Sequence, residues 1–221
     1  MIHIQKNSPP SEFINFVKQT PQIHFDDIPS DIKSILRKSL LQEQGYLCAY
    51  CMSRIYDDHN TTKIEHYRAR NDFNELDYSN LLAVCSGNFF DDSYEHQHCV
   101  TRKGEKFLNI NPQNALHISM IDYKSDGTIF SKKNSNFNDD FNKILNLNDE
   151  HGYLKINRKI ALQKFQEKLH RDFKDKSATV TFLKKALNFY SLSHENHREA
   201  YCGIIIRYIE KKLNSLDYRE S

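Results

Sequence analysis

The fold is decided by four segments: LCAYC at 47–51, TKIEHYRAR at 62–70, YSNLLAVC at 78–85 and HCVTRKG at 98–104. They contain four of the five cysteines of the 221-residue chain and the Glu-His pair at 65–66. In a reducing compartment, cysteines grouped in this way favour a metal site over disulfides. The rest of the chain is interpreted by what it adds to this stretch.

The first cysteine pair, Cys48 and Cys51, has the C-x2-C spacing that lets two thiolates bind one tetrahedral ion. On its own the pair could equally be a dithiol redox motif, but that chemistry needs no further cysteines. Cys85 follows after 33 residues and Cys99 after a further 13. Four thiolates would complete a closed structural zinc site, the alternative being buried cysteines without a metal. Two neighbouring histidines could replace Cys99 as fourth ligand: His96 and His98.

Composition limits the classes of function. Apolar residues make up 38% of the chain and charged residues 27%, as in a folded protein with a polar surface. The formal net charge is only +2, so nucleic-acid binding would need a local basic patch. The chain has no apolar run of 18 residues and its start, MIHIQKNSPP, has no signal-peptide pattern. We therefore expect a cytoplasmic protein.

The Glu-His pair lies between the two cysteine pairs, at the end of a short strand expected around Ile64. Phosphodiester hydrolysis needs a base that activates water, a divalent cation and positive groups that position the phosphates. His66 could be the base and Glu65 a cation ligand. Arg68 and Arg70 follow as basic residues that could contact nucleic acid. An exposed histidine beside a glutamate is more often an ordinary surface pair, so context has to support this interpretation.

The order of the motifs supplies that context. An acidic residue with a histidine, an asparagine followed by leucine, and a cysteine before a basic helix start together resemble the HNH, or ββα-metal, nucleases. The resemblance implies a two-stranded hairpin and one helix around a single divalent ion, Mg²⁺ or Mn²⁺. It implies that His66 is the general base, Glu65 the ion's ligand and Asn80 the residue that braces the loop. The four cysteines would be the zinc staple found in many members.

The similarity extends over residues 30–165 and is most specific in the order CAYC, IEH, SNLL, C, HC and KG. Together with LLQEQGYLCAYCMSRI at 40–55 and DGTI at 126–129, these elements look like the PtuB family. PtuB is the HNH effector of Septu and of a related retron anti-phage system. The resemblance implies a partner of the ABC or SMC-like ATPase type, similar to PtuA.

The chain departs from the HNH pattern just after the last cysteine, where an Asn, His or Asp usually faces the ion. Val100 stands there, and valine cannot bind a cation. Another residue, such as His98 or Asn88, could supply the contact, or the ion could be held more weakly, or activity could be reduced. Arg102 and Lys103 remain candidates for phosphate contact, with a solvated charge run as the alternative.

These observations predict an α+β protein with a zinc-stapled ββα-metal core. Residues 1–44 are expected to form an N-terminal helical lead-in, residues 45–130 the HNH core with a following hairpin, and residues 131–221 a helical C-terminal lobe. The predicted function is a metal-dependent endonuclease acting as the effector of an ATPase-coupled defence complex. A zinc-ribbon module that binds nucleic acid without cutting it, and a structural adapter, are the alternatives.

Individual elements follow from periodicity and turn residues. Helical spacing predicts helices over 12–17 and from Ser30 to near Gly45, and three further helices beyond residue 142. The Asp126-Gly127 dipeptide predicts the turn of a hairpin at 118–130. The polar segment KKNSNFNDD, residues 132–140, is expected to be a loop.

Overall fold

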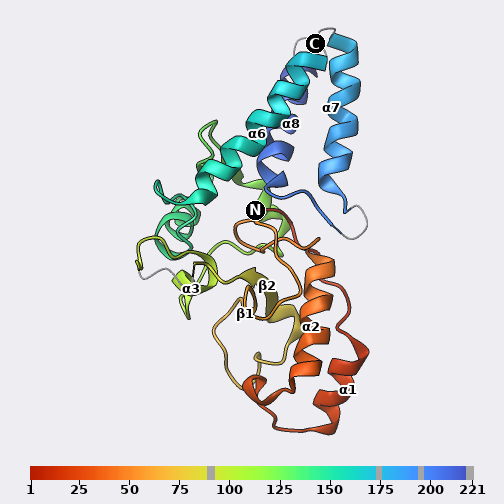
Figure 1. Ribbon diagram of the computed structural model, residues 1–221, viewed down its shortest axis with the longest axis vertical. Helices are drawn as coiled ribbons and strands as arrows, with labels where there is room; N and C mark the ends of the chain where they lie inside the picture. The colour runs from red at the N-terminus through yellow and green to blue at the C-terminus, as the bar shows by residue number, and fades with distance from the viewer. Residues whose placement is uncertain (89–92, 173–175, 194–196, 218–221) are drawn as a thin grey trace.

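The computed structural model describes residues 1–88, 93–172, 176–193 and 197–217. The chain is an α+β protein in which two small antiparallel sheets lie among helices (Figure 1). The strands are β1 (Thr62–His66), β2 (Leu81–Cys85), β3 (Ile121–Tyr123) and β4 (Ile129–Ser131). The α-helices are α1 (Ser11–Gln19), α2 (Ser30–Glu43), α3 (Cys99–Lys103), α4 (Ala115–Ser119), α5 (Ser135–Asp139), α6 (Tyr153–Asp172), α7 (Lys176–Ser191) and α8 (Cys202–Asp217). Three other helical turns are η1 (Phe25–Asp27), η2 (Tyr78–Asn80) and the π-helix η3 (Asp140–Ile144).

Helix α2 delivers the chain to the first cysteine pair. It starts directly after Pro29, and its apolar residues share one face, which is fully buried: Leu36, Leu40 and Leu41. The helix ends because Gly45 adopts a φ of +63°, which lets the Tyr46 backbone N–H donate to the Leu41 carbonyl in a Schellman cap. The predicted helices over 12–17 and from Ser30 to near Gly45 are confirmed.

Strands β1 and β2 form an antiparallel hairpin with α3 packed beside β2, which is a ββα unit. The register pairs Glu65 with Leu82 and His66 with Leu81. Strand β2 is buried from Leu81 to Val84, so the hairpin lies inside the molecule rather than on its surface. Residues 67–77 connect the two strands as a long irregular segment, which η2 joins to β2.

The hairpin predicted after the core is confirmed as β3 and β4. Its turn closes with a hydrogen bond from the Lys124 N–H to the Thr128 carbonyl, and Gly127 has a φ of +91°. The predicted loop at 132–140 is wrong, since this segment forms α5 and the start of η3. Asn134 caps α5 by accepting from the Asn136 N–H, and Phe137 is buried. The Asn134 cap and the burial of Phe137 together stabilise a helix in this mainly polar segment.

Buried apolar residues form two main clusters. The larger combines residues of the N-terminal segment, the ββα unit, the β3–β4 hairpin and the first turn of α6. The second belongs to α6, α7 and α8, with Phe165, Leu183 and Ile209 among its members. In Figure 1 these three helices project from the ββα unit as one lobe. The three-part division of the chain at residues 44 and 130 stays a prediction.

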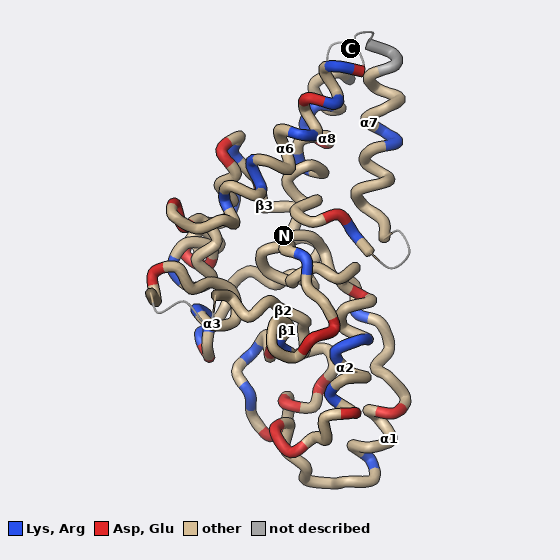
Figure 2. Tube along the Cα trace, in the orientation of Figure 1, with Lys and Arg blue, Asp and Glu red and all other residues tan. Residues whose placement is uncertain are grey.

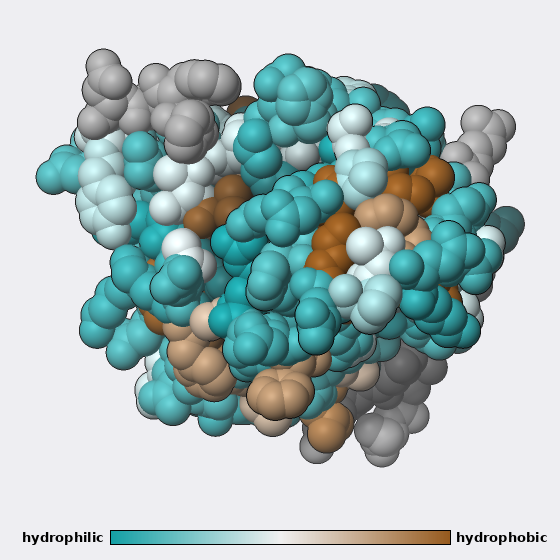
Figure 3. Space-filling view, turned by 90° about the horizontal axis from the view of Figure 1, so that it is seen from below, coloured by the Kyte–Doolittle hydropathy of each residue, from teal (hydrophilic) through white to brown (hydrophobic). Residues whose placement is uncertain are grey.

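Basic and acidic residues are both spread along the trace (Figure 2). Helices α6 and α7 carry more basic than acidic residues. The end of the molecule formed by α1, α2 and the neighbouring loops is mostly hydrophilic, with apolar side chains in small separate patches (Figure 3). Among the described residues, no helix combines the length and the apolar character needed to cross a membrane.

Candidate active site and metal centre

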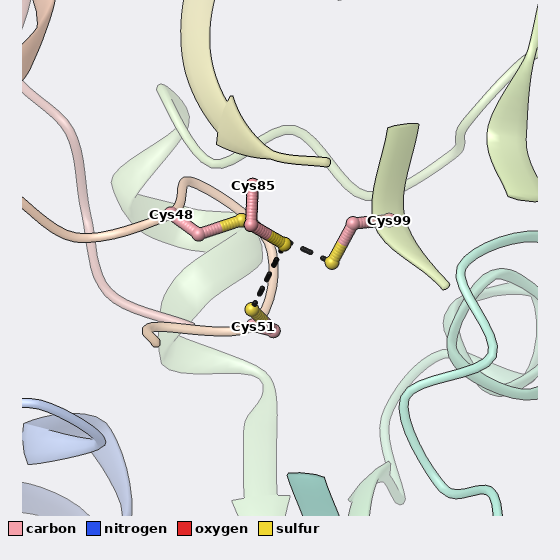
Figure 4. Close-up of side chains that lie close together, drawn as sticks. All are labelled: Cys48, Cys51, Cys85 and Cys99. Carbon is pink, nitrogen blue, oxygen red and sulfur yellow. Dashed lines mark hydrogen bonds between the residues drawn. The ribbon is translucent and has the colours of Figure 1, made fainter. Parts of the chain in front are cut away.

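Four cysteine side chains point toward one another in the interior (Figure 4). Their sulfur atoms all lie within 4.8 Å of one another. The Sγ atoms of Cys48 and Cys99 are 3.9 Å apart, and those of Cys51 and Cys85 are 3.8 Å apart. A tetrahedral zinc ion with Zn–S bonds of about 2.3 Å would hold its sulfur ligands about 3.8 Å apart. The cluster therefore fits a structural zinc ion.

The tetrad joins three segments that are separate in sequence. Cys48 and Cys51 follow α2, Cys85 ends β2 and Cys99 begins α3. The Ser53 backbone N–H points to Cys51 Sγ at 3.5 Å, the kind of contact that supports a thiolate ligand. Zinc at this position would tie helix, hairpin and α3 together and would not touch a substrate.

The two neighbouring histidines lie outside the tetrad. Nδ1 of His98 is 3.9 Å from Cys85 Sγ, and its Nε2 forms a 2.9 Å hydrogen bond with the Tyr153 hydroxyl. Nδ1 of His96 lies 2.9 Å from a carboxylate oxygen of Asp149. The fourth position of the cluster is thus taken by Cys99, while His98 connects the tetrad to the first residue of α6.

A pocket of about 270 Å³ opens at the end of β1. Its lining includes Glu65, His66, Arg70 and Lys103. The structure therefore brings together four of the residues that the sequence proposed for catalysis and phosphate contact. The remaining three, Asn80, Arg68 and Arg102, do not line this pocket.

His66 is held as a neutral imidazole. Its Nε2 lies 2.9 Å from the Glu75 carbonyl oxygen, and since a carbonyl can only accept, the bond assigns the proton to Nε2. Nδ1 keeps its lone pair and has no hydrogen-bond partner in the part of the chain that the structure describes. The Phe25 ring meets the imidazole edge-on, with centroids 4.6 Å apart. Burial lowers the pKa of His66, because the charged imidazolium is poorly solvated there.

Glu65 lines the pocket and is paired there with a lysine. Its Oε1 lies 2.6 Å from Lys103 Nζ, and both side chains are buried, Lys103 to 1% exposure. The contact is an ion pair without the alignment of a hydrogen bond. Lys103 also donates to the carbonyl oxygens of His66 at 3.1 Å and Gly104 at 3.2 Å. Burial raises the pKa of Glu65, and the nearby ammonium opposes that shift.

This arrangement does not fit a divalent ion at Glu65 as the side chains stand. The Lys103 ammonium already neutralises the Glu65 carboxylate, in the place where an ion would have to bind. Val100 packs against the apolar core. Neither proposed substitute faces Glu65, because His98 contacts Tyr153 and Asn88 donates to the His96 carbonyl. Among the described residues, Glu65 and His66 belong to no group of three metal-ligating side chains.

Replacing Lys103 should show how much the buried Glu65 carboxylate destabilises the fold when it has no counter-charge. Lys103→Met is expected to lower the free energy of unfolding by about 3 kcal/mol, because it leaves Glu65 without a counter-charge. Urea denaturation at neutral pH measures the loss. The double variant Lys103→Met/Glu65→Gln should recover most of it, since no charge then remains buried. A double variant less stable than Lys103→Met alone would show that the ion pair is not the cause.

Asn80 spans the segment that follows β1. Its Oδ1 accepts from the Arg68 backbone N–H at 2.8 Å, and its Nδ2 donates to the Arg68 and Asn74 carbonyl oxygens. The side chain is buried and ties Arg68 to Asn74, the residue just before Glu75.

The basic residues divide between surface and interior. Arg68 and Arg70 are exposed, and Arg70 pairs with Asp26 at 2.8 Å. Arg102 stacks on Tyr94 with its guanidinium 3.8 Å from the ring centroid and donates to the Tyr94 carbonyl. Lys103 is buried against Glu65, so it does not form a surface charge run with Arg102. Lys103 lines the pocket described above.

Two residues that orient His66 were not among the sequence-based candidates: Glu75 and Phe25. Glu75 acts through a backbone carbonyl, which no side-chain pattern marks. Phe25 lies 41 positions before His66, and only folding places its ring there.

The hairpin, helix α3, cysteine tetrad and Glu-His pair together are consistent with a nuclease core of the HNH class. No family profile matches the chain. The chain is 34% identical over 98 residues to an Escherichia coli protein of retron Ec83 that is named as a candidate HNH endonuclease. The match covers 39% of this chain and 38% of that protein, so the chain spans well under half of its relative. This similarity supports a relationship to HNH endonucleases.

Proposed function

We propose that the chain is an HNH-type endonuclease that hydrolyses phosphodiester bonds of nucleic acid, with DNA as the expected substrate. The observation that carries the proposal is the placement of His66: buried, neutral and with Nδ1 free, in a pocket that also holds Arg70 and Lys103. The zinc tetrad supports the same hairpin from its other end, at Cys85.

In this proposal His66 acts as the general base. Nδ1 takes a proton from water as the water oxygen attacks phosphorus and the ester oxygen leaves with a proton from solvent. The Glu75 carbonyl holds Nε2–H and stabilises the imidazolium that forms. Arg70 and Lys103 line the same pocket, and they would offset the phosphate charge if the phosphate took the place of their present partners, Asp26 and Glu65.

A catalytic Mg²⁺ or Mn²⁺ enters the proposal only through the resemblance to HNH nucleases. Such an ion stabilises negative charge on phosphate oxygens as a Lewis acid. Glu65 is the ligand that the resemblance assigns to it, and the ion would have to replace the Lys103 ammonium there.

A second candidate function is nucleic-acid binding without cleavage. It is favoured by Val100 and by the Lys103–Glu65 pair, which together leave the expected ion site without a free ligand. Incubation of purified protein with supercoiled plasmid and Mg²⁺ or Mn²⁺ separates the two functions. Nicking supports the nuclease, whereas retarded migration of an uncut plasmid supports the binding module.

The pH dependence of cleavage follows from His66. Burial lowers its pKa below the usual value of 6.5, so the base form persists on acidification until the pH falls below that value. We expect kcat/KM to stay level from about pH 8 to pH 6.5 and to fall only at lower pH. Initial rates measured across this range test the expectation. An acid limb with its midpoint above 6.5 would contradict it.

We further propose that the protein works with an ATPase subunit of the ABC or SMC-like type, similar to PtuA, in anti-phage defence. The support is the resemblance to PtuB, the retron protein matched above and the apolar side chains exposed on the helical lobe: Ile156, Ile160, Phe189 and Leu192. Co-purification with an ATPase encoded next to this chain tests the proposal. Phe189→Glu should abolish the association, and Phe73→Glu, at another exposed phenylalanine, should not.

A further inference from the structure

A second group of metal-ligating side chains lies beside His66, separate from the zinc tetrad and from the Glu65–Lys103 pair. It consists of His24, which precedes η1, and of Asp72 and Glu75, which lie in the connection between β1 and β2. One imidazole nitrogen and one oxygen from each carboxylate lie within 4.8 Å of one another. Two distant segments thus present three ligand atoms to one small volume.

The geometry of the group suits neighbouring ligands of one ion. His24 Nδ1 and Glu75 Oε1 form a hydrogen bond of 2.8 Å, which a bound ion would replace. Two ligands at right angles on an ion, with bonds of about 2.1 Å, lie about 3.0 Å apart. The other Glu75 oxygen is fixed by the Phe25 backbone N–H at 3.0 Å. The carboxylate is therefore oriented before any ion arrives.

The remaining two ligands can adjust. The His24 side chain is 65% exposed, and Asp72 is also exposed, so both can move toward an ion without disturbing the core. One nitrogen and two carboxylate oxygens suit a divalent transition ion better than Mg²⁺ or Ca²⁺, because imidazole is a poor ligand for the latter. Three protein ligands leave further positions for water.

We propose that His24, Asp72 and Glu75 bind one divalent transition-metal ion, with Mn²⁺ as its simplest probe, and that this ion positions His66. The positioning role rests on the proposed nuclease function, whereas the binding site itself does not. Glu75 holds the His66 Nε2–H through its carbonyl, and Phe25 contacts both the Glu75 carboxylate and the His66 ring. An ion bound by His24 and Glu75 would hold Glu75 and Phe25 in place. It would thereby fix the two contacts that orient the His66 ring, the Glu75 carbonyl on Nε2 and the Phe25 ring.

The test is a Mn²⁺ titration followed by electron paramagnetic resonance, with zinc already bound and no nucleic acid present. Wild type is expected to bind one Mn²⁺ at this site. His24→Ala and Asp72→Asn should each weaken that binding at least tenfold while leaving zinc content and melting temperature unchanged. His59→Ala is the matched control, because His59 is exposed beside Asp58 in a similar pair at 3.9 Å.

Two further measurements locate the ion. Glu65→Gln should leave Mn²⁺ binding unchanged, and bound Mn²⁺ should broaden the His66 ring resonances in wild type but not in His24→Ala. Absence of Mn²⁺ binding in wild type, or its loss in Glu65→Gln and not in His24→Ala, would overturn the proposal. Because nucleic acid is absent, an inactive nuclease would leave the binding result intact.

Discussion

Replacing Cys48 with serine is expected to abolish cooperative folding of the ββα unit. Structural zinc contributes on the order of 10 kcal/mol of apparent binding free energy coupled to folding. That equals the whole stability of a typical domain, about 5–15 kcal/mol. The tetrad joins the turn after α2, the end of β2 and the start of α3, so its loss releases all three. A strand pair of five residues each could not hold them.

Circular dichroism and zinc content measured by atomic emission test this expectation. Cys202→Ser is the matched control, because Cys202 is equally buried but lies on α8, apart from the tetrad. Its replacement should cost only about 1–3 kcal/mol and leave the zinc bound. If Cys48→Ser melted at the same temperature as Cys202→Ser, the tetrad would not be a zinc site that supports the fold.

His66→Ala should remove cleavage while leaving the fold and the zinc content in place. Loss of a general base costs on the order of 10²–10⁴ in rate, because water must then react without proton transfer to a positioned acceptor. The stability cost should be small, about 1 kcal/mol, since the variant loses one hydrogen bond to the Glu75 carbonyl. Plasmid nicking rates and thermal melting measure the two effects separately.

The exposed His59 supplies a control for this variant as well, and His59→Ala should cut at the wild-type rate. Wild-type cleavage by His66→Ala would remove the histidine from the mechanism. If instead His66→Ala and Cys48→Ser lost zinc and structure alike, His66 would be a structural residue. Only loss of cleavage from a folded, zinc-loaded protein agrees with its role as the base.

Much of the fold could be predicted from local patterns. The end of α2 at Gly45 and the hairpin turn at Gly127 are backbone conformations that glycine favours, so the residue type indicates them. The segment 132–140 could not be predicted in this way. Its polar composition indicated a loop, but Phe137 is buried in the main core, and this burial stabilises α5. Tertiary burial outweighed local propensity there.

The candidate site was predictable in its chemistry and less so in its contacts. Glu65 and His66 end one strand, so they could be assigned to one site from their position. The partner of Glu65 could not be assigned. Lys103 lies 38 positions later, and whether it faces solvent or the carboxylate depends on how α3 is rotated against β2. The charge of Lys103 suggested a position on the surface, but the packing of α3 places its side chain in the interior.

The sequence by itself indicated a cysteine metal site and the order of the ββα unit, because ligand spacing and strand periodicity are local properties of the chain. That Cys99 and neither neighbouring histidine completes the tetrad was decided by the tertiary structure. Only the tertiary structure decided what surrounds the Glu-His pair. Lys103 neutralises Glu65, the Glu75 carbonyl sets the tautomer of His66, and His24 reaches Glu75 from a distant segment. Each of these contacts joins residues whose separation in space depends on how the packed elements are oriented, which no local pattern encodes.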